Sequence, residues 1–303
     1  MASATELKLG NLAVLVPAGD RCGEGALWSE GEQAVYWTDI NRYLVHRYRL
    51  ADRATHSWMF DEPVVALSLT TDPDKMIVAL GSGLLLWSSA TDDRTRLGFD
   101  LPSYPAERLN DGRTDPAGRF WVGSMRNNVG GQGEPLPAGG TDGKLFRIGA
   151  GIEAAVFRDE IGVSNTLVWS PDRSTFYFAD TMANVIWAHD YDPERGIGAP
   201  RIFFEGFERG SPDGSAIDSE GFVWNCRFGG GCIVRIAPDG SVDRVIDMPV
   251  TNPTTAVFGG RDLKTLYITS ASVFTPPTER LAGALFALPT NVAGLAENLY
   301  RLG

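Results

Sequence analysis

Residues 165–180, NTLVWSPDRSTFYFAD, show the plan on which the whole chain is built. A short apolar stretch leads into a polar turn and then into a second stretch rich in Val, Ile, Phe, Tyr and Trp. Six such copies start 42, 44, 55, 48 and 41 residues apart, at Glu24, Ala66, Asn110, Asn165, Asp213 and Thr254. A repeat of about 40–50 residues that holds several short strands is typical of a β-propeller blade. The sequence therefore predicts an all-β, six-bladed β-propeller of four-stranded antiparallel blades.

Each copy is followed by candidates for a third and a fourth strand. The fourth strands are predicted at residues 55–60, 94–99, 153–158, 200–205 and 242–247. For the last blade the candidates are LAVLV (residues 12–16) and NLYRL (residues 298–302). Pairing residues 12–16 with the C-terminal strands would remove two open sheet edges. We therefore expect the N-terminal and C-terminal strands to close the ring.

The spacing of the repeats leaves no room for a linker, so we expect one domain over residues 1–303. The longest interval contains a segment rich in Gly and Pro, residues 126–143, which is predicted to be a long surface loop. Such a loop is either a tolerated insertion or a lid over the axial pocket.

The charge of the chain restricts its partners. With 27 Lys and Arg against 38 Asp and Glu, the formal net charge is −11, and such a surface repels phosphate backbones and anionic lipids. Neither a secretory signal nor an apolar run of about 20 residues occurs in the sequence. We expect a cytoplasmic protein that binds neither nucleic acid nor membrane.

Four of the six repeats begin with an oxygen-bearing side chain: Glu24, Asn110, Asn165 and Asp213. Each lies five residues before a turn residue, which puts all four at the entrance of an innermost strand. Equivalent positions of a radial repeat meet near the axis, where these groups would repel one another unless a cation lay between them. Oxygen ligands suit Ca²⁺, Mg²⁺ or Mn²⁺, and Zn²⁺ also accepts carboxylates. The alternative is that each residue caps its own turn.

Histidine is absent from these positions. The three histidines, His46, His56 and His189, fall in predicted outer strands or turns. A Ser–His–Asp relay or a histidine-based zinc site therefore lacks its imidazole. If the protein is a hydrolase, a metal must do the work that histidine does elsewhere. The tryptophans that recur at repeat positions are predicted to pack between blades.

Several motifs resemble one known family. GEGALW, RLNDGRTDPAGRFWVGSM, SNTLVWSPD, SPDGSAID and FGGRDLKTLYITSA are similar to segments of gluconolactonases, senescence marker protein (regucalcin) and luciferin-regenerating enzymes. The resemblance implies a six-bladed propeller with one catalytic divalent metal in its central channel. By this resemblance Glu24, Asn165 and Asp213 look like the metal ligands. Arg108 and Asn110 look like substrate-binding groups.

Two departures from the family pattern concern the pocket. Thr166 stands where many members have glycine, which would reshape the wall beside the metal. Asn128 matches a position at which some animal members place an acidic residue that contacts the sugar. An Asn there can still bond hydroxyl groups. Arg126 is a candidate for meeting an anionic substituent, although a surface role is the plainer interpretation.

The leading hypothesis is metal-dependent hydrolysis of a sugar lactone to its aldonic acid. Asp213 is the candidate general base, and Arg108, Asn110 and Asn128 would orient the ring. A second hypothesis is a metal-dependent organophosphate or aryl-ester hydrolase, against which the polar side chains argue. A third is a propeller without catalytic activity that binds calcium or another protein.

Overall fold

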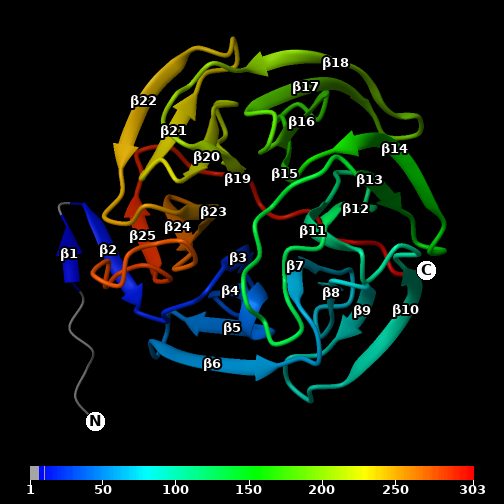
Figure 1. Ribbon diagram of the computed structural model, residues 1–303, viewed down its shortest axis with the longest axis horizontal. Coiled ribbons are helices and arrows are strands. Elements are labelled where there is room, and N and C mark those ends of the chain that lie inside the picture. The colour runs from blue at the N-terminus through cyan, green and yellow to red at the C-terminus, as the bar shows by residue number, and fades with distance from the viewer. Residues whose placement is uncertain (1–6, 10) are drawn as a thin grey trace.

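The computed structural model, which describes residues 7–9 and 11–303, consists of six antiparallel sheets arranged around a central axis (Figure 1). Each sheet is one blade, and its strands are numbered here from the axis outward. Blade 1 comprises β3 (Gly23–Ser29), β4 (Ala34–Asp39), β5 (Leu44–Arg49) and β6 (Ala54–Met59). Blade 2 comprises β7 (Val64–Leu69), β8 (Met76–Leu80), β9 (Gly83–Trp87) and β10 (Arg94–Asp100). Blade 3 comprises β11 (Glu107–Thr114), β12 (Phe120–Arg126), β13 (Gly143–Ile148) and β14 (Ala154–Ile161).

The remaining blades repeat this order. Blade 4 comprises β15 (Ser164–Trp169), β16 (Thr175–Asp180), β17 (Val185–Asp192) and β18 (Gly196–Phe204). Blade 5 comprises β19 (Ser211–Ile217), β20 (Val223–Phe228), β21 (Cys232–Ile236) and β22 (Val242–Asp247). Blade 6 comprises β23 (Pro253–Gly259), β24 (Thr265–Ser270), β25 (Leu285–Pro289), β2 (Leu12–Val16) and β1 (Leu7–Leu9). The 3₁₀ turn η1 (Ile40–Arg42) follows β4, and no helix in the described residues is long and apolar enough to cross a bilayer. The predicted propeller is thus confirmed.

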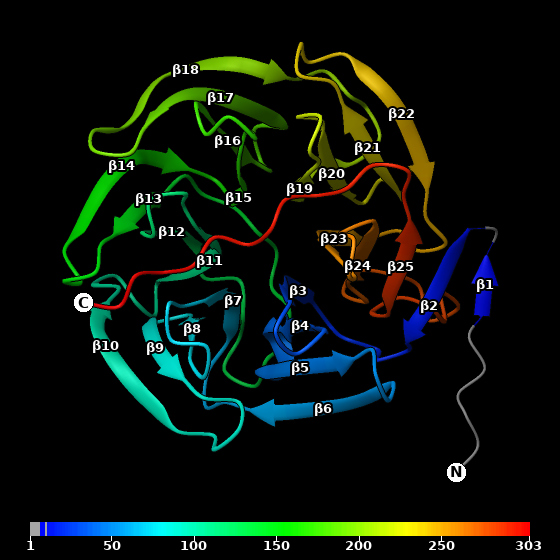
Figure 2. The ribbon, with the colours of Figure 1, turned by 180° about the vertical axis from the view of Figure 1, so that it is seen from behind.

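The ring is closed by the N-terminal strand. β2 pairs antiparallel with β25, with Ala13 opposite Ala287 and Val14 opposite Phe286. The alternative fourth strand, NLYRL, is wrong, because residues 298–302 lie outside this sheet. They belong to a C-terminal segment that crosses the face of the propeller turned away from the viewer in Figure 1. This segment is shown in red in Figure 2.

Local hydrogen bonds explain why the turns and the core fit together. Asp115 accepts the backbone N–H of Ala117 and also the indole N–H of Trp121, at 2.9 and 2.8 Å. Asp218 in blade 5 likewise accepts the indole N–H of Trp224 at 2.9 Å. One carboxylate therefore both shapes the turn and satisfies a buried donor of the core. The tryptophans at repeat positions are buried, as predicted.

All six innermost strands carry an irregularity where they pair with the second strand of their blade. The register shifts lie between Glu24 and Leu27, Val64 and Ala66, Leu109 and Gly112, Asn165 and Val168, Pro212 and Ser215, and Pro253 and Ala256. A bulge bends its strand and redirects side chains. The irregularity recurs near the start of every repeat, where Glu24, Asn165 and Asp213 reach the cavity described below.

The C-terminal segment ties distant blades together across the face seen in Figure 2. Ser219 of blade 5 donates its backbone N–H to Ala293, and Arg301 donates its own to Gly118 of blade 3. Tyr300 is 1% exposed and pairs with blade 2 through the Leu69 carbonyl. Its hydroxyl donates to the Gly149 carbonyl at 2.7 Å.

Replacing Tyr300 tests this segment. We expect Tyr300→Ala to lower the free energy of unfolding by about 3–5 kcal/mol, the usual range for removing a buried aromatic ring. Tyr300→Phe, which removes only the buried hydroxyl, is expected to cost about 1 kcal/mol. Urea denaturation measures both values. Leu299→Ala, a change at an exposed neighbour, is the control; an equal loss in that variant would contradict a specific role for Tyr300.

Candidate functional site

A cavity of about 450 Å³ lies at one end of the axis and brings together the six residues predicted to bind the metal or the substrate. Glu24 comes from β3, Asn165 from β15 and Asp213 from β19, so three blades contribute the three proposed metal ligands. Arg108 and Asn110 lie on β11, and Asn128 lies in the segment that follows β12. No histidine is among the described residues that line this cavity.

The two carboxylates of the cavity are buried side by side. Glu24 is 8% exposed and Asp213 is 7% exposed. Burial raises the pKa of Glu24 well above its usual range, and the negative charge of Asp213 raises it further. Burial also raises the pKa of Asp213, with Asp111 adding to the effect, while a hydrogen bond with Glu24 opposes it. Neither carboxylate forms an ion pair within the described chain. No cationic side chain of the described residues is therefore paired directly with either carboxylate.

Arg108 holds the amide side chains in place. Its guanidinium donates to Oδ1 of Asn110 at 2.7 Å and to Oδ1 of Asn128 at 2.6 and 3.0 Å. Burial lowers the pKa of Arg108 to about 10, so the group remains a cation at neutral pH. One buried cation therefore fixes two carboxamides that face the same cavity.

Asn165 is oriented from both sides. Its Nδ2 donates to Oγ1 of Thr181 at 2.8 Å, and that hydroxyl donates to the Pro212 carbonyl at 2.7 Å. Nδ2 of Asn110 approaches Oδ1 of Asn165 at 3.4 Å. With its amide nitrogen bound to Thr181, Asn165 presents its oxygen on the side of Asn110 and the cavity.

Asp111 is a further charged residue near the site, one for which the sequence analysis gave no role. Its carboxylate accepts the backbone N–H groups of Gly112, Thr166 and Leu167, which join β11 to β15. Burial raises the pKa of Asp111, and its charge in turn raises the pKa of Glu24 and Asp213. In the sequence, the only indication of such a role is that Asp111 directly follows Asn110. The bulge breaks the alternation of side chains along this strand, so the sequence does not predict to which side Asp111 points.

The wall of the cavity is mostly apolar. It is formed by Ile40, Met125, Val163, Met182, Phe228, Val273 and Phe274, with Cys22 beside them. Met182 and Phe274 are exposed at its edge. The polar site residues therefore share the cavity with a largely hydrocarbon wall.

The segment between β12 and β13 also lines the cavity, through Asn128, Pro135 and Ala138. Figure 1 shows it in green, running from blade 3 toward blade 1. There the Gly133 carbonyl accepts Nδ2 of Asn41 at 2.9 Å and a guanidinium N–H of Arg21 at 3.3 Å. This contact joins two blades that are not neighbours in the ring.

Two residues that depart from the family pattern have defined places. Arg126 pairs with Asp142 at 2.7 Å, is largely exposed and is not among the residues lining the cavity. Thr166 is fully buried and has a φ of +56°, a conformation that a β-branched residue rarely adopts.

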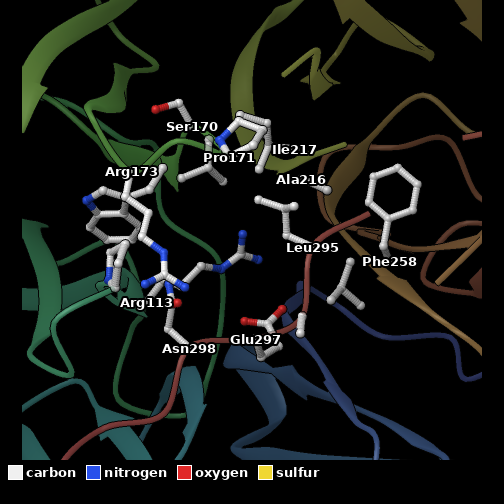
Figure 3. Close-up of a pocket in the computed structure, with 15 residues that line it drawn as sticks. Arg113, Ser170, Pro171, Arg173, Ala216, Ile217, Phe258, Leu295, Glu297 and Asn298 are labelled. Atoms are coloured by element: carbon white, nitrogen blue, oxygen red, sulfur yellow. The ribbon is translucent and has the colours of Figure 1, made fainter. Parts of the chain in front are cut away.

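A second cavity, of about 210 Å³, lies where the C-terminal segment crosses the base of the innermost strands (Figure 3). Arg113 and Glu297 both point into it. Burial raises the pKa of Glu297, and the charge of Arg113 opposes that rise. Arg113 similarly opposes the raised pKa of Asp111. This cavity is lined by one carboxylate and by two arginines, Arg113 and Arg173, whereas the first is lined by two carboxylates and one arginine.

The donor set of the first cavity fits a divalent cation. Glu24 and Asp213 supply two buried carboxylates that form no ion pair within the described residues, and Asn165 supplies a fixed neutral oxygen. Such oxygens are the ligands of hard divalent ions. Among residues 7–9 and 11–303 no three His, Cys, Asp or Glu side chains are grouped to hold a metal. Any site here therefore needs the carboxamide as well as the two acids.

These features define a six-bladed propeller with an axial cavity that combines carboxylate, carboxamide and guanidinium groups. The chain belongs to the SMP-30/gluconolactonase/LRE-like family, whose model matches residues 22–272. It is 36% identical to the 6-deoxy-6-sulfogluconolactonase of Pseudomonas putida, over 92% of this chain and 94% of that protein. It is 32% identical to the pentonolactonase XacC of Haloferax volcanii, over 93% and 96% of the two chains.

The solved structures agree with this assignment. A calcium-binding protein, regucalcin, from Agrobacterium tumefaciens superposes with a TM-score of 0.88 at 29% sequence identity. The match covers 95% of this chain and 97% of that one.

Proposed function

We propose that this protein hydrolyses a sugar lactone to the aldonic acid, using one divalent ion held by Glu24, Asn165 and Asp213. One observation carries the proposal: two buried carboxylates, with no ion-pair partner among the described residues, lie with a fixed carboxamide in a cavity of about 450 Å³. The lactonase names of the relatives at 36% and 32% identity support the same reaction class. The ion would be Ca²⁺, Mg²⁺, Mn²⁺ or Zn²⁺.

The residues have separate roles in this proposal. A bound divalent ion would polarise the lactone carbonyl and stabilise negative charge on its oxygen. Asp213 would take the proton of the attacking water, because its carboxylate lies in the same cavity as Glu24 and Asn165, where the substrate carbonyl would bind. Glu24 keeps the charge of the site negative, and Asn165 offers a neutral oxygen.

Asn128 is the residue best placed to bind a substrate hydroxyl. Oδ1 of Asn128 is occupied by Arg108, whereas its Nδ2 makes no hydrogen bond within the described residues. Nδ2 is therefore free to donate to a hydroxyl or ring oxygen. The side chain of Asn110 is hydrogen-bonded to Arg108 and to the Ser164 carbonyl. It would therefore act chiefly by holding the side chains of Arg108 and Asn165 in position. Arg108 is the one basic residue among those lining the cavity, which favours a neutral lactone.

An organophosphate or aryl-ester hydrolase is the second candidate. The apolar wall that includes Met125, Phe228 and Phe274 favours it, since aryl substrates bury hydrocarbon. The Arg108 network favours the lactone, because polar groups with free donors are satisfied by hydroxyls.

A pH-drop assay distinguishes these functions. The chelated protein would be given hexono- and pentonolactones and, separately, paraoxon, and each divalent ion would then be restored in turn. We expect lactone hydrolysis above the spontaneous rate only after an ion is restored. Preferential turnover of paraoxon would replace the proposal with the second candidate. Binding of the ion without turnover of either substrate would favour a non-catalytic calcium-binding propeller.

The loop over residues 126–143 is proposed to act as a lid whose contact with Asn41 sets substrate binding. A Cβ on Gly133 would lie 2.1 Å from the Asn41 carbonyl oxygen, and the glycine has a φ of +75°. We expect Gly133→Ala to raise KM for the lactone about tenfold with little change in kcat, as steady-state kinetics would show. Gly131→Ala is the matched control, because its Cβ meets nothing within 4 Å. Equal KM values for the two variants would argue against the lid.

A further inference from the structure

We propose that Thr166 and Thr254 are positioning residues that fix the backbone of the metal ligands in the neighbouring blade, an inference that rests on the proposed metal site. Thr166 lies on β15 and Thr254 on β23, and both are fully buried. Each hydroxyl bonds across the boundary to the next blade in the ring. Each donates to a carbonyl at, or next to, a proposed ligand of the following blade.

The first contact links blade 4 to blade 5. Oγ1 of Thr166 donates to the carbonyl of Asp213 at 2.5 Å and lies 2.9 Å from the hydroxyl of Ser215. Asn225 donates to the same Asp213 carbonyl at 3.1 Å. Thr166 directly follows Asn165 in the chain, so one residue connects the backbones of two proposed ligands.

The second contact links blade 6 to blade 1 and is again a threonine hydroxyl donating to a carbonyl of the next blade. Oγ1 of Thr254 donates to the carbonyl of Gly23, the residue before Glu24, at 2.5 Å. It also lies 2.8 Å from the hydroxyl of Thr269. The carbonyls that accept from the two threonines therefore lie at or beside both carboxylate ligands.

Comparison within the repeat shows that Thr166 does more than fill space. Gly25 follows Glu24 as Thr166 follows Asn165, and the two residues have φ values of +57° and +56°. Glycine adopts this conformation without strain, whereas a β-branched residue does so only where its surroundings hold it. Blade 1 has the residue expected for this backbone, and blade 4 has one that adds a hydroxyl at the cost of strain. Compared with glycine, threonine at this position gains the hydrogen bond to the Asp213 carbonyl.

A series of variants tests the positioning role. Thr166→Val keeps the shape of the side chain and removes the hydroxyl, Thr166→Ser keeps the hydroxyl, and Thr166→Gly removes both the hydroxyl and the strain. Thr254→Val tests the second contact. The matched control is Thr114→Val, which removes a buried hydroxyl that lies 2.5 Å from Ser68 between blades 3 and 2, away from the ligands.

The readouts are the calcium Kd by titration calorimetry, and kcat and KM for a lactone. Loss of a residue that orients a metal ligand typically weakens metal affinity 10–100-fold. We expect Thr166→Val and Thr254→Val to raise Kd at least about tenfold and to lower kcat, with Thr166→Ser close to wild type. Thr114→Val should leave both values unchanged.

Three results would overturn the inference. These are wild-type calcium affinity and kcat in both valine variants, an equal loss in Thr114→Val, and failure of serine to restore the values. If Thr166→Val does not fold, Thr166→Gly and Thr254→Val carry the test. If the wild-type protein neither binds nor uses Ca²⁺, Mg²⁺, Mn²⁺ or Zn²⁺ to hydrolyse a lactone, the proposed function fails instead, which separates the two failures.

Discussion

Asp213→Asn should lower kcat/KM for the lactone by at least about 10³-fold. The change removes the proposed general base, whose contribution is typically 10²–10⁴-fold, and also removes one of two charged metal ligands. The amide has nearly the shape of the carboxylate, so the cavity keeps its form. Steady-state hydrolysis at saturating metal measures the effect.

The stability of the same variant gives an independent check. Because burial and the charge of Asp111 disfavour an ionised Asp213 in the folded protein, a neutral amide at this position avoids that cost. We therefore expect metal-free Asp213→Asn to be at least as stable as the metal-free wild type at neutral pH. Asp190→Asn, at an exposed residue paired with Arg201, is the control and should change neither activity nor stability appreciably. Activity within tenfold of wild type in Asp213→Asn would rule out the proposed base.

Removal of the metal should destabilise the protein. A ligand that binds only the folded state at 100 times its Kd stabilises it by about 2.7 kcal/mol. We expect added calcium to raise the free energy of unfolding of chelated wild-type protein by about that amount. Glu24→Gln should abolish the increase, because the site then has one negative charge in place of two. A calcium response in Glu24→Gln equal to that of wild type would exclude Glu24 as a ligand.

The pH dependence of this stability follows from the raised pKa values. In the metal-free fold, Glu24 and Asp213 keep protons that the unfolded chain loses at its ordinary carboxyl pKa. The folded state then binds more protons than the unfolded state, so these groups make stability fall as pH rises from the ordinary range toward the raised values. Arg108 lowers the pKa of Glu24 and therefore limits the effect, while Asp111 enlarges it. A divalent ion needs the ionised carboxylates, so its stabilising effect should grow with pH. Unfolding with and without calcium at pH 6 and pH 8 would show both trends.

Much of the architecture could be read from the sequence because a propeller repeats. The copies beginning at Glu24, Asn165 and Asp213 share one offset to their turns, and that offset alone placed three side chains at one end of the axis. Strand 12–16 was predicted to close the ring, since an unpaired edge is unfavourable. These inferences need only local patterns and the symmetry of the ring.

The remaining features depend on contacts outside the repeat. The bulge between Leu109 and Gly112 breaks strand alternation, so the place of Asp111 could not be derived from period-two patterning. The hydrogen bond between Asn41 and the Gly133 carbonyl joins segments that are far apart in the sequence, and so does the bond from Tyr300 to the Gly149 carbonyl. Neither segment resembles the other blades, so no internal copy indicated where it would pack.

The most direct test is a crystal structure of the protein loaded with Mn²⁺, with anomalous difference density to locate the ion. We expect one peak in the axial cavity, with side-chain oxygens of Glu24, Asn165 and Asp213 all within about 2.0–2.6 Å, the range for hard divalent ions. A peak bound elsewhere, or an ion in the cavity that any of these three residues fails to reach, would contradict the proposed site.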